Sequence, residues 1–433
     1  SIVDAVDANP GDGVCDDGLG NCPLRAAIQE SNALGGAHTI TLPAGIHTLT
    51  IGGVGENASA TGDLDVTSNI TINGISTSVT IIDVNNIDRG FHLLSTGQLT
   101  ISNTTIKNGN TLKDHGGGFL NQGVLSINYC HITENTSTLP VGATYSGGFG
   151  GGIANFGNLT IENSTLFLNE AIGGRGTNGQ NGGGGGGSTP GFGGAIYNNL
   201  NGVITLKNST ISNNNAVGGK FSSGSTNGGN FTFTGKRGAG LLGGNGGAAG
   251  GSAGGNGGDF SGGGGGGSSG SFGGTGGTGG YGAGGGGRGA RSGGGTSPGS
   301  GGLNGFGGGQ GCNPCCSSGG GGGGGAGFGG GIFNNGGTIT SINSSIAFNS
   351  AYGGQGQRLN SIGGYAAGGT PGQGLGGGIF NRSGSVDLSN TLIASNTNYN
   401  DILNSNTAGI TSSEEMYGTF TSTNGHNLIF NIG

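Results

Sequence analysis

Apolar and polar residues alternate in short stretches along most of the chain, and turns rich in Asn, Ser and Thr separate these stretches. Copies of one two-strand phrase begin at Leu99, Leu125, Leu159, Ile204, Ile339 and Val386. A third strand-like stretch with GGGF, GGGI or GGAI precedes most copies. Because alternation with a period of two predicts strands, each unit is predicted to hold three short strands. The pattern predicts an all-β protein, a right-handed parallel β-helix of about eight coils.

The repeat also predicts which side chains face inward and which form the corners. Stacked coils each need only a few inward apolar residues. The candidates are Ile161, Leu166, Ile204, Ile211, Ile339 and Ile346. Asn recurs at the turns, where its side chain tolerates left-handed backbone angles, and stacked Asn side chains can form hydrogen-bonded ladders. These corner residues are Asn103, Asn163, Asn208, Asn343 and Asn390.

The N-terminal residues do not follow the repeat. In NCPLRAAIQESNALGG, Pro23 suits a first helical position, and Gly35 and Gly36 suit a helix end. The apolar residues at helical spacing are Leu24, Ala27, Ile28 and Leu34. An amphipathic helix here would cap the exposed core of the solenoid. We therefore divide the chain into a cap (1–37), a β-helix (38–216 and 330–433) and a Gly-rich insertion (217–329).

Gly-rich segments all enter at one corner of the repeat, at 172–193, 217–329 and 352–376, with a shorter Ser/Gly loop at 136–149. One interpretation is a flexible linker. The other, which we favour, is an ordered bundle of polyglycine-type helices, because several runs keep a period of three. The aromatic residues Phe260, Phe272, Tyr281, Phe306 and Phe328 would then anchor the bundle.

Composition excludes several classes of function. Of 433 residues, 118 are Gly, 8% are charged and the net charge is −7, so no basic surface for nucleic acid is expected. No apolar run approaches the ~18 residues of a membrane span. The chain begins at Ser1 rather than Met, which we interpret as a processed, exported protein. We expect a secreted or cell-surface location.

The six cysteines are consistent with an oxidising location. Cys15 and Cys22 are close in sequence and are predicted to form a local disulfide. The pairing of the other four remains open: Cys312, Cys315 and Cys316 cluster in CNPCC, and one of them could reach Cys130 or another subunit. A zinc site is the alternative, but no His accompanies the cluster.

One group of carboxylates is the candidate for catalysis: Asp63, Asp65, Asp83 and Asp88, beside Arg89 and His92. Asp63 and Asp65 are two apart on a predicted strand and face the same side, and Asp83 is expected to approach them one coil later. Paired carboxylates serve acid–base hydrolysis or bind Ca²⁺. The alternative interpretation, which we favour, is a charge network that seals the first coils.

A second acidic group is a weaker calcium candidate. It comprises Asp7, Asn9, Asp12, Asp16 and Asp17. Oxygen ligands at short spacing resemble a calcium loop, but the closing bidentate Glu is missing. A solvated acidic turn closed by the Cys15–Cys22 disulfide is the preferred interpretation, and no cofactor is expected.

With these residues identified, the N-terminus resembles the CSLREA domain of exported bacterial β-helix proteins. The matching stretch runs from Cys22 to Ile28, with Pro for Ser and Ala for Glu, which leaves Glu30 as the nearest partner for Arg25. Further matching phrases begin at Gly62, Thr80 and Gly425. The resemblance implies a secreted or surface-exposed protein of pectin-lyase-like architecture. The GGGI and GGAI phrases are similar to polymorphic outer-membrane autotransporter passengers.

These patterns lead to three functional hypotheses. The first is a structural or adhesive surface protein without enzymatic activity, which associates end to end into a filament or binds other surface proteins or polysaccharide. Its basis is the scarcity of charge, the large Gly-rich face and the strand-like C-terminal NLIFNIG. The second is a polysaccharide lyase or glycoside hydrolase. The third is a recognition module that binds a receptor or surface through the Gly-rich face.

Overall fold

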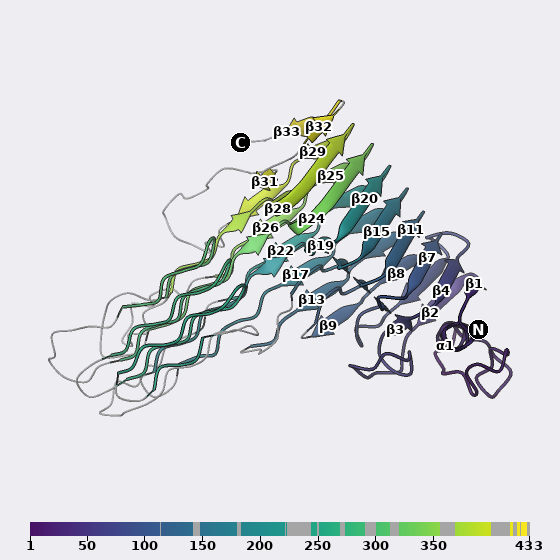
Figure 1. The fold of residues 1–433 in the computed structure, drawn as a ribbon, viewed down its shortest axis with the longest axis horizontal. Helices are drawn as coiled ribbons and strands as arrows, with labels where there is room; N and C mark the ends of the chain where they lie inside the picture. The colour runs from purple at the N-terminus through teal and green to yellow at the C-terminus, as the bar shows by residue number, and fades with distance from the viewer. Residues whose placement is uncertain are drawn as a thin grey trace.

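The computed structural model describes residues 1–112, 114–141, 148–179, 183–220, 222, 244–248, 251–268, 273–290, 300–311, 320–355, 369–399, 416–418, 422–424 and 426–430. These residues are almost entirely parallel β structure, with a single α-helix, α1 (Leu24–Leu34), at the N-terminal end. Figure 1 shows the strands stacked in order of sequence, so that each pass of the chain lies against the previous one.

The largest sheet has 15 strands and contains two neighbouring stacks. Two long strands, β24 and β28, run through both stacks and join them. The strands of this sheet are β1 (Ala37–Thr41), β3 (Leu64–Val66), β4 (Asn69–Asn73), β6 (Phe91–Leu93), β7 (Gln98–Ser102), β10 (Phe119–Asn121), β11 (Val124–Asn128), β14 (Ile153–Asn155), β15 (Asn158–Glu162), β19 (Ile196–Asn198), β20 (Val203–Lys207), β24 (Ile332–Ile342), β28 (Ile379–Ser389), β31 (Met416–Gly418) and β32 (Ser422–Asn424).

The next sheet along each coil has nine strands. They are β2 (Gly45–Thr48), β5 (Thr80–Asp83), β8 (Thr105–Lys107), β12 (His131–Thr133), β16 (Thr165–Phe167), β21 (Thr210–Ser212), β25 (Ser345–Ala347), β29 (Leu392–Ala394) and β33 (Leu428–Phe430).

The predicted count of three strands per unit was one too low. A further sheet of six strands follows the second turn of the repeat. Each of these strands is short, and its inward residue is small, as with Ala171, Ala216 and Ala351, so its alternation is hard to see in the sequence. The six are β9 (Asn110–Leu112), β13 (Thr136–Thr138), β17 (Glu170–Ile172), β22 (Asn215–Val217), β26 (Ser350–Tyr352) and β30 (Thr397–Tyr399).

The core consists of apolar residues that repeat at the same position in successive coils. All six predicted inward residues are fully buried. The register explains this, because Ile161 of β15 lies between Ile127 of β11 and Leu206 of β20. Each inward side chain therefore packs on its equivalents above and below, and a coil needs few of them.

Three ladders of Asn side chains run along the stack. The predicted corner residues have left-handed backbones, with φ between 48° and 55°. From Asn163 onward they form an outer ladder, in which each later Asn amide donates to the corner Asn of the preceding coil, as Asn390 does to Asn343 at 2.7 Å. Two further ladders are fully or almost fully buried: Asn121, Asn155, Asn198, Asn334 and Asn381, and Asn135, Asn169, Asn214, Asn349 and Asn396.

Helix α1 covers the first strands, as the spacing of its apolar residues predicts. Leu24 and Ile28 belong to the same core cluster as the strands, whereas Leu34 is 47% exposed. Pro23 is the N-cap, and the helix ends at Gly35, whose φ of 66° suits glycine. Arg25 is fully buried and pairs with Asp4 at 2.7 Å. The expected partner Glu30 was wrong; its carboxylate accepts the backbone N–H groups of Gly11 and Gly13 instead.

The described Gly-rich segments run side by side away from the strands (Figure 1). Their backbone hydrogen bonds recur at every third residue: Gly274, Gly277 and Gly280 donate to Gly267, Gly264 and Ser261 at 2.7–2.9 Å. This spacing is the one expected of extended helices with three residues per turn. A Cβ on Gly277 would lie 1.9 Å from the Gly255 carbonyl oxygen, so only glycine permits this approach.

An aromatic cluster joins these segments to the strands. Its buried rings are Phe149, Phe192, Tyr197, Phe328, Phe333 and Phe380. Three short strands lie beside it, β18 (Gly191–Phe192), β23 (Gly327–Phe328) and β27 (Gly374–Leu375). Phe260, Tyr281 and Phe306 pack on these rings, as residues that anchor the Gly-rich segments are expected to do. Phe272 lies outside the described residues.

The buried ladders lead to a stability prediction. The Asn169 side chain accepts the Asn135 backbone N–H and donates to Asn214 and to the Ile132 carbonyl. Asn169→Ala leaves these buried groups unpaired and is expected to lower the free energy of unfolding by about 3 kcal/mol. Chemical denaturation of both proteins measures the change.

Asn208→Gly is the matched control, since it removes an exposed ladder amide and keeps the left-handed corner. It is expected to change stability by less than about 1 kcal/mol. Equal losses in the two variants would contradict the role assigned to the buried ladder.

Candidate functional site

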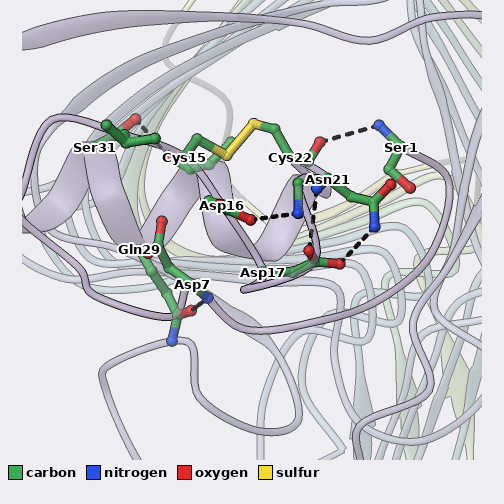
Figure 2. The surroundings of a disulfide bond; sticks show 12 residues. Ser1, Asp7, Cys15, Asp16, Asp17, Asn21, Cys22, Gln29 and Ser31 are labelled. Atoms are coloured by element: carbon green, nitrogen blue, oxygen red, sulfur yellow. Dashed lines mark hydrogen bonds between the residues drawn. A yellow bond between two sulfur atoms is a disulfide. The ribbon is translucent and has the colours of Figure 1, made fainter.

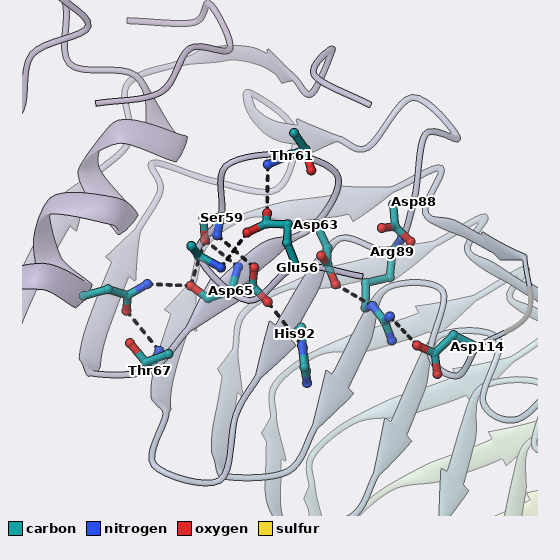
Figure 3. A network of polar contacts seen from close by, with 12 residues as sticks. Glu56, Ser59, Thr61, Asp63, Asp65, Thr67, Asp88, Arg89, His92 and Asp114 are labelled. Carbon is teal, nitrogen blue, oxygen red and sulfur yellow. Dashed lines mark hydrogen bonds and ion pairs between the residues drawn. The ribbon is translucent and has the colours of Figure 1, made fainter. Parts of the chain in front are cut away.

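The structure brings Asp63, Asp65 and His92 together at the first coils (Figure 3). Asp65 of β3 lies beside His92 of β6 in the parallel register, and Asp63 immediately precedes β3. One ligand atom from each of the three side chains lies within 4.8 Å of the others. The predicted pairing of Asp63 and Asp65 on one side is therefore confirmed, and His92 joins them.

Arg89 connects this group to a further carboxylate. Its guanidinium contacts Asp63 at 2.5 Å and Asp114 at 2.6 Å, and it donates to the His115 carbonyl at 3.0 Å. Asp88 lies beside it and accepts the Arg89 backbone N–H. Asp114 was not among the predicted residues, because it lies in a connection rather than in a repeated strand.

Asp83 does not join the group. It ends β5, in the nine-stranded sheet, where it lies 3.4 Å from Lys107 and accepts a hydrogen bond from the Asn108 amide. The expectation that Asp83 approaches Asp63 and Asp65 was wrong because its strand belongs to a different face of the coil.

Burial governs the electrostatics of the group. Desolvation raises the pKa of Asp63 to about 7, and the opposing effect of Arg89 does not cancel it. Burial likewise raises the pKa of Asp88. Burial also acts to raise the pKa of Asp114, but the Arg89 charge and hydrogen bond outweigh it and lower that pKa. Desolvation lowers the pKa of His115 to about 4, so this ring is neutral at pH 7.

The group has few atoms left for a substrate or metal. Asp63, Asp65 and Arg89 are 4%, 0% and 7% exposed. Asp65 also accepts the Ser59 backbone N–H at 2.8 Å. Asp63, Asp65 and His92 offer the ligand atoms that a cation would need, but Arg89 already supplies positive charge to Asp63, and a second cation there would be repelled. The arrangement suits a charge network that seals the first coils.

The acidic loop does not form a calcium site in the structure. The Asp12 carboxylate accepts from Val14 and Asn9, and that of Asp16 accepts from the backbone of Gly18 and Gly20. Asp17 bonds Leu19 and Asn21, and Asp7 accepts the Asn9 backbone N–H. These are turn contacts within the loop rather than converging ligands.

Figure 2 shows the predicted Cys15–Cys22 disulfide, which is present with an S–S distance of 2.02 Å.

Cys130 is a buried free thiol. Its sulfur donates to the Ile101 and Asn128 carbonyls at 3.4 and 3.3 Å, and burial raises its pKa to about 11. It occupies the inward corner position that Ser164 fills in the next coil, where the Ser164 hydroxyl accepts the Cys130 N–H. Because Cys130 is free, the alternative in which one of the CNPCC cysteines pairs with it is wrong. Cys312, Cys315 and Cys316 lie outside the described residues, and their pairing with one another or with another subunit stays a prediction.

A surface groove of about 430 Å³ lies at the corner between the 15-stranded and nine-stranded sheets. It was not anticipated from the sequence. Its lining residues are Ser76, Thr77, Asn103, Tyr129, Cys130, His131, Asn163 and Thr165. The available sequence signal was Tyr129, which stands where the other copies of the phrase have Asn.

Comparison with known proteins returned nothing: no protein-family model, no curated protein and no solved structure matches the chain. The resemblance noted in the sequence therefore stays a prediction. In the described part of the chain, no helix has the length and hydropathy needed to span a membrane.

The raised pKa of Asp63 leads to a prediction about pH. This pKa is about 7 in the folded chain and has its ordinary value of 3.8 in the unfolded chain. Between pH 3.8 and 7, Asp63 therefore binds a proton more strongly in the folded protein than in the unfolded protein. Its contribution to stability is therefore present below pH 4 and is lost as the pH rises toward 7. Relative to Asp63→Asn, the wild-type protein should lose on the order of a few kcal/mol of unfolding free energy between pH 4 and 8.

Denaturant titrations of both proteins at several pH values measure the difference between their unfolding free energies. Taking the difference removes the contributions of the titrating groups that the two proteins share. Asp83→Asn is the control, because Asp83 lies on the other sheet. If the difference in unfolding free energy between the wild type and Asp63→Asn does not change with pH, the raised pKa assigned to Asp63 is wrong.

Proposed function

We propose that the protein is a secreted or cell-surface structural and adhesive protein. In this proposal a right-handed parallel β-helix of about eight coils is the scaffold. Polyglycine-type helices form a rigid bundle at one corner, and this bundle makes the adhesive contact. The observation that carries the proposal is the period-three hydrogen bonding of the glycine segments, because a mere linker would need no such order.

The exposed side chains of the bundle suit contact with an extended surface. The described stretches 244–248, 251–258 and 273–280 contain no charged residue, and their exposed positions carry small groups: Asn245, Ala248, Ser252, Ala253, Asn256 and Thr275. Small side chains lose little rotamer entropy on binding, and a backbone held by hydrogen bonds is already ordered. A rigid bundle therefore loses little further freedom when it adheres.

Attachment to the scaffold supports a mechanical role. Arg382 of β28 lies over the Phe260 and Tyr281 rings, 4.8 and 4.4 Å from their centroids, and pairs with Asp259 at 3.0 Å. These contacts and the aromatic cluster transmit load from bundle to strands. The Cys15–Cys22 disulfide supports the proposed extracellular location, because disulfides persist in oxidising compartments.

A polysaccharide lyase or glycoside hydrolase is the competing proposal. Such enzymes place two carboxyl groups on either side of an accessible sugar bond. The Asp63 and Asp65 carboxylates are instead buried and bonded to Arg89, Ser59 and His92. This arrangement counts against Asp63 and Asp65 as the catalytic pair of such an enzyme.

End-to-end association is part of the proposal for partners. Ile429 of β33 is 42% exposed, whereas the residues at the same register position in β29 and β25, Ile393 and Ile346, are fully buried. A second copy that extends the stack would cover Ile429. Light scattering and electron microscopy across concentration and salt test this part separately.

Adhesion of the full-length protein tests the role of the bundle. Gly277→Val places side-chain atoms against the Gly255 carbonyl and should disrupt the bundle. We expect adsorption to polystyrene and silica, measured with a quartz-crystal microbalance, to weaken at least about tenfold, or roughly 1.4 kcal/mol.

Val203→Lys is the control, because it adds a charge on the exposed side of β20 without touching the bundle. It should leave adsorption unchanged. If Gly277→Val adsorbs as the wild-type protein does, while hydrogen exchange shows its bundle amides unprotected, the adhesive role is wrong.

A further inference from the structure

One wall of the groove beside Tyr129 is the connection that contains Ser76 and Thr77. The connection from β4 to β5 runs over residues 74–79, whereas the next coil turns from β7 to β8 through Asn103 and Thr104 alone. The longer connection therefore stands out beside the shorter corner. The Thr105 hydroxyl donates to the Thr77 carbonyl at 2.8 Å, and the Thr80 hydroxyl accepts the Ile75 N–H at 3.1 Å. These bonds hold the wall in place.

Tyr129 is the aromatic residue of the groove lining apart from His131. It takes the corner position at which the other copies of the phrase have Asn, and its φ is 52°. A bulky side chain in this left-handed conformation costs on the order of 1 kcal/mol, which Asn largely avoids. Tyr129 is 55% exposed, so the burial of its side chain does not offset this cost.

Tyr129 also interrupts the outer Asn ladder. The Asn163 amide, which would meet an Asn at position 129, donates instead to Asn128 at 3.0 Å. The coil thus keeps a strained aromatic residue where Asn would serve both the backbone and the ladder. Strained residues of this kind concentrate at binding sites.

The groove lining is polar and uncharged. Hydroxyls come from Ser76, Thr77 and Thr165, and amides from Asn103 and Asn163. Desolvation lowers the pKa of His131, which keeps its ring neutral at pH 7. Among the described residues, no Lys, Arg, Asp or Glu lines the groove, so its described lining lacks the groups that recognise phosphates, uronic acids or cations.

We propose that this groove binds a neutral oligosaccharide, with one sugar ring stacked on Tyr129. Sugar rings have C–H faces that pack on an aromatic ring and hydroxyls at their edges that form hydrogen bonds. The groove offers both kinds of partner, because the Tyr129 ring lies among amide and hydroxyl side chains. The volume of about 430 Å³ lies within the range of small-ligand sites, about 300–1,000 Å³. The site lies at a different corner of the coil from the glycine bundle and does not depend on its adhesion.

Tyr129→Asn is the decisive variant because it restores the residue of the other coils. It should leave the unfolding free energy unchanged or higher, and it should weaken glycan binding at least about tenfold, or roughly 1.4 kcal/mol. Tyr129→Phe keeps the ring and should retain binding. Phe348→Asn is the matched control: Phe348 is also exposed with a left-handed backbone, φ 59°, but lies outside the groove.

Affinity electrophoresis of the full-length protein in native gels makes the measurement. The gels contain laminarin, galactomannan, xyloglucan or dextran as neutral probes, and polygalacturonate or alginate as anionic ones. The proposal is supported if a neutral probe slows the wild type, Tyr129→Phe and Phe348→Asn in the gel but leaves the mobility of Tyr129→Asn unchanged. Three results would overturn it: no retardation by any neutral probe, equal retardation of Tyr129→Asn, or retardation by the anionic probes alone.

Discussion

Hydrogen bonding between successive coils is the constraint on which the rest of the structure depends. Backbone groups of each strand bond to the coil above and the coil below, so every coil must keep the same outline. Where the backbone turns, buried Asn side chains such as Asn169 and Asn214 take over the bonding that a strand would provide. Apolar side chains then need to fill only a narrow interior, which is why a chain that is 30% hydrophobic can form a long core.

The glycine segments satisfy the same constraint without side chains. Their N–H groups bond to neighbouring segments at every third residue, and carbonyl oxygens occupy the space in which a Cβ would lie. Because such a bundle buries almost no apolar surface of its own, it depends on the aromatic cluster for attachment. The uneven insertions thus build one displayed element on a uniform scaffold, which is the basis of the adhesive proposal.

Charge is concentrated where the repeat begins. Arg25 with Asp4, and Arg89 with Asp63 and Asp114, join the N-terminal helix and the first connections to the early coils. Removing one partner from such a buried pair leaves an uncompensated charge, so these residues form a unit. By contrast, the groove beside Tyr129 is open and lined by uncharged residues, and the proposed glycan site there rests on this lining together with the left-handed, exposed Tyr129.

The sequence by itself determined the strand phrase, the inward residues such as Ile161, the Asn corners and the extent of helix α1, because each follows from local periodicity or turn chemistry. Only the tertiary structure decided which side chains meet across coils. Arg89 joins Asp114 to Asp63, and His92 lies beside Asp63, whereas Asp83 pairs with Lys107 on another sheet. The connection at 74–79 and the Tyr129 corner, which come from different coils, line one groove. Such contacts depend on stacking register and on the lengths of connections, and residues in different coils are separated by distances that no local pattern encodes.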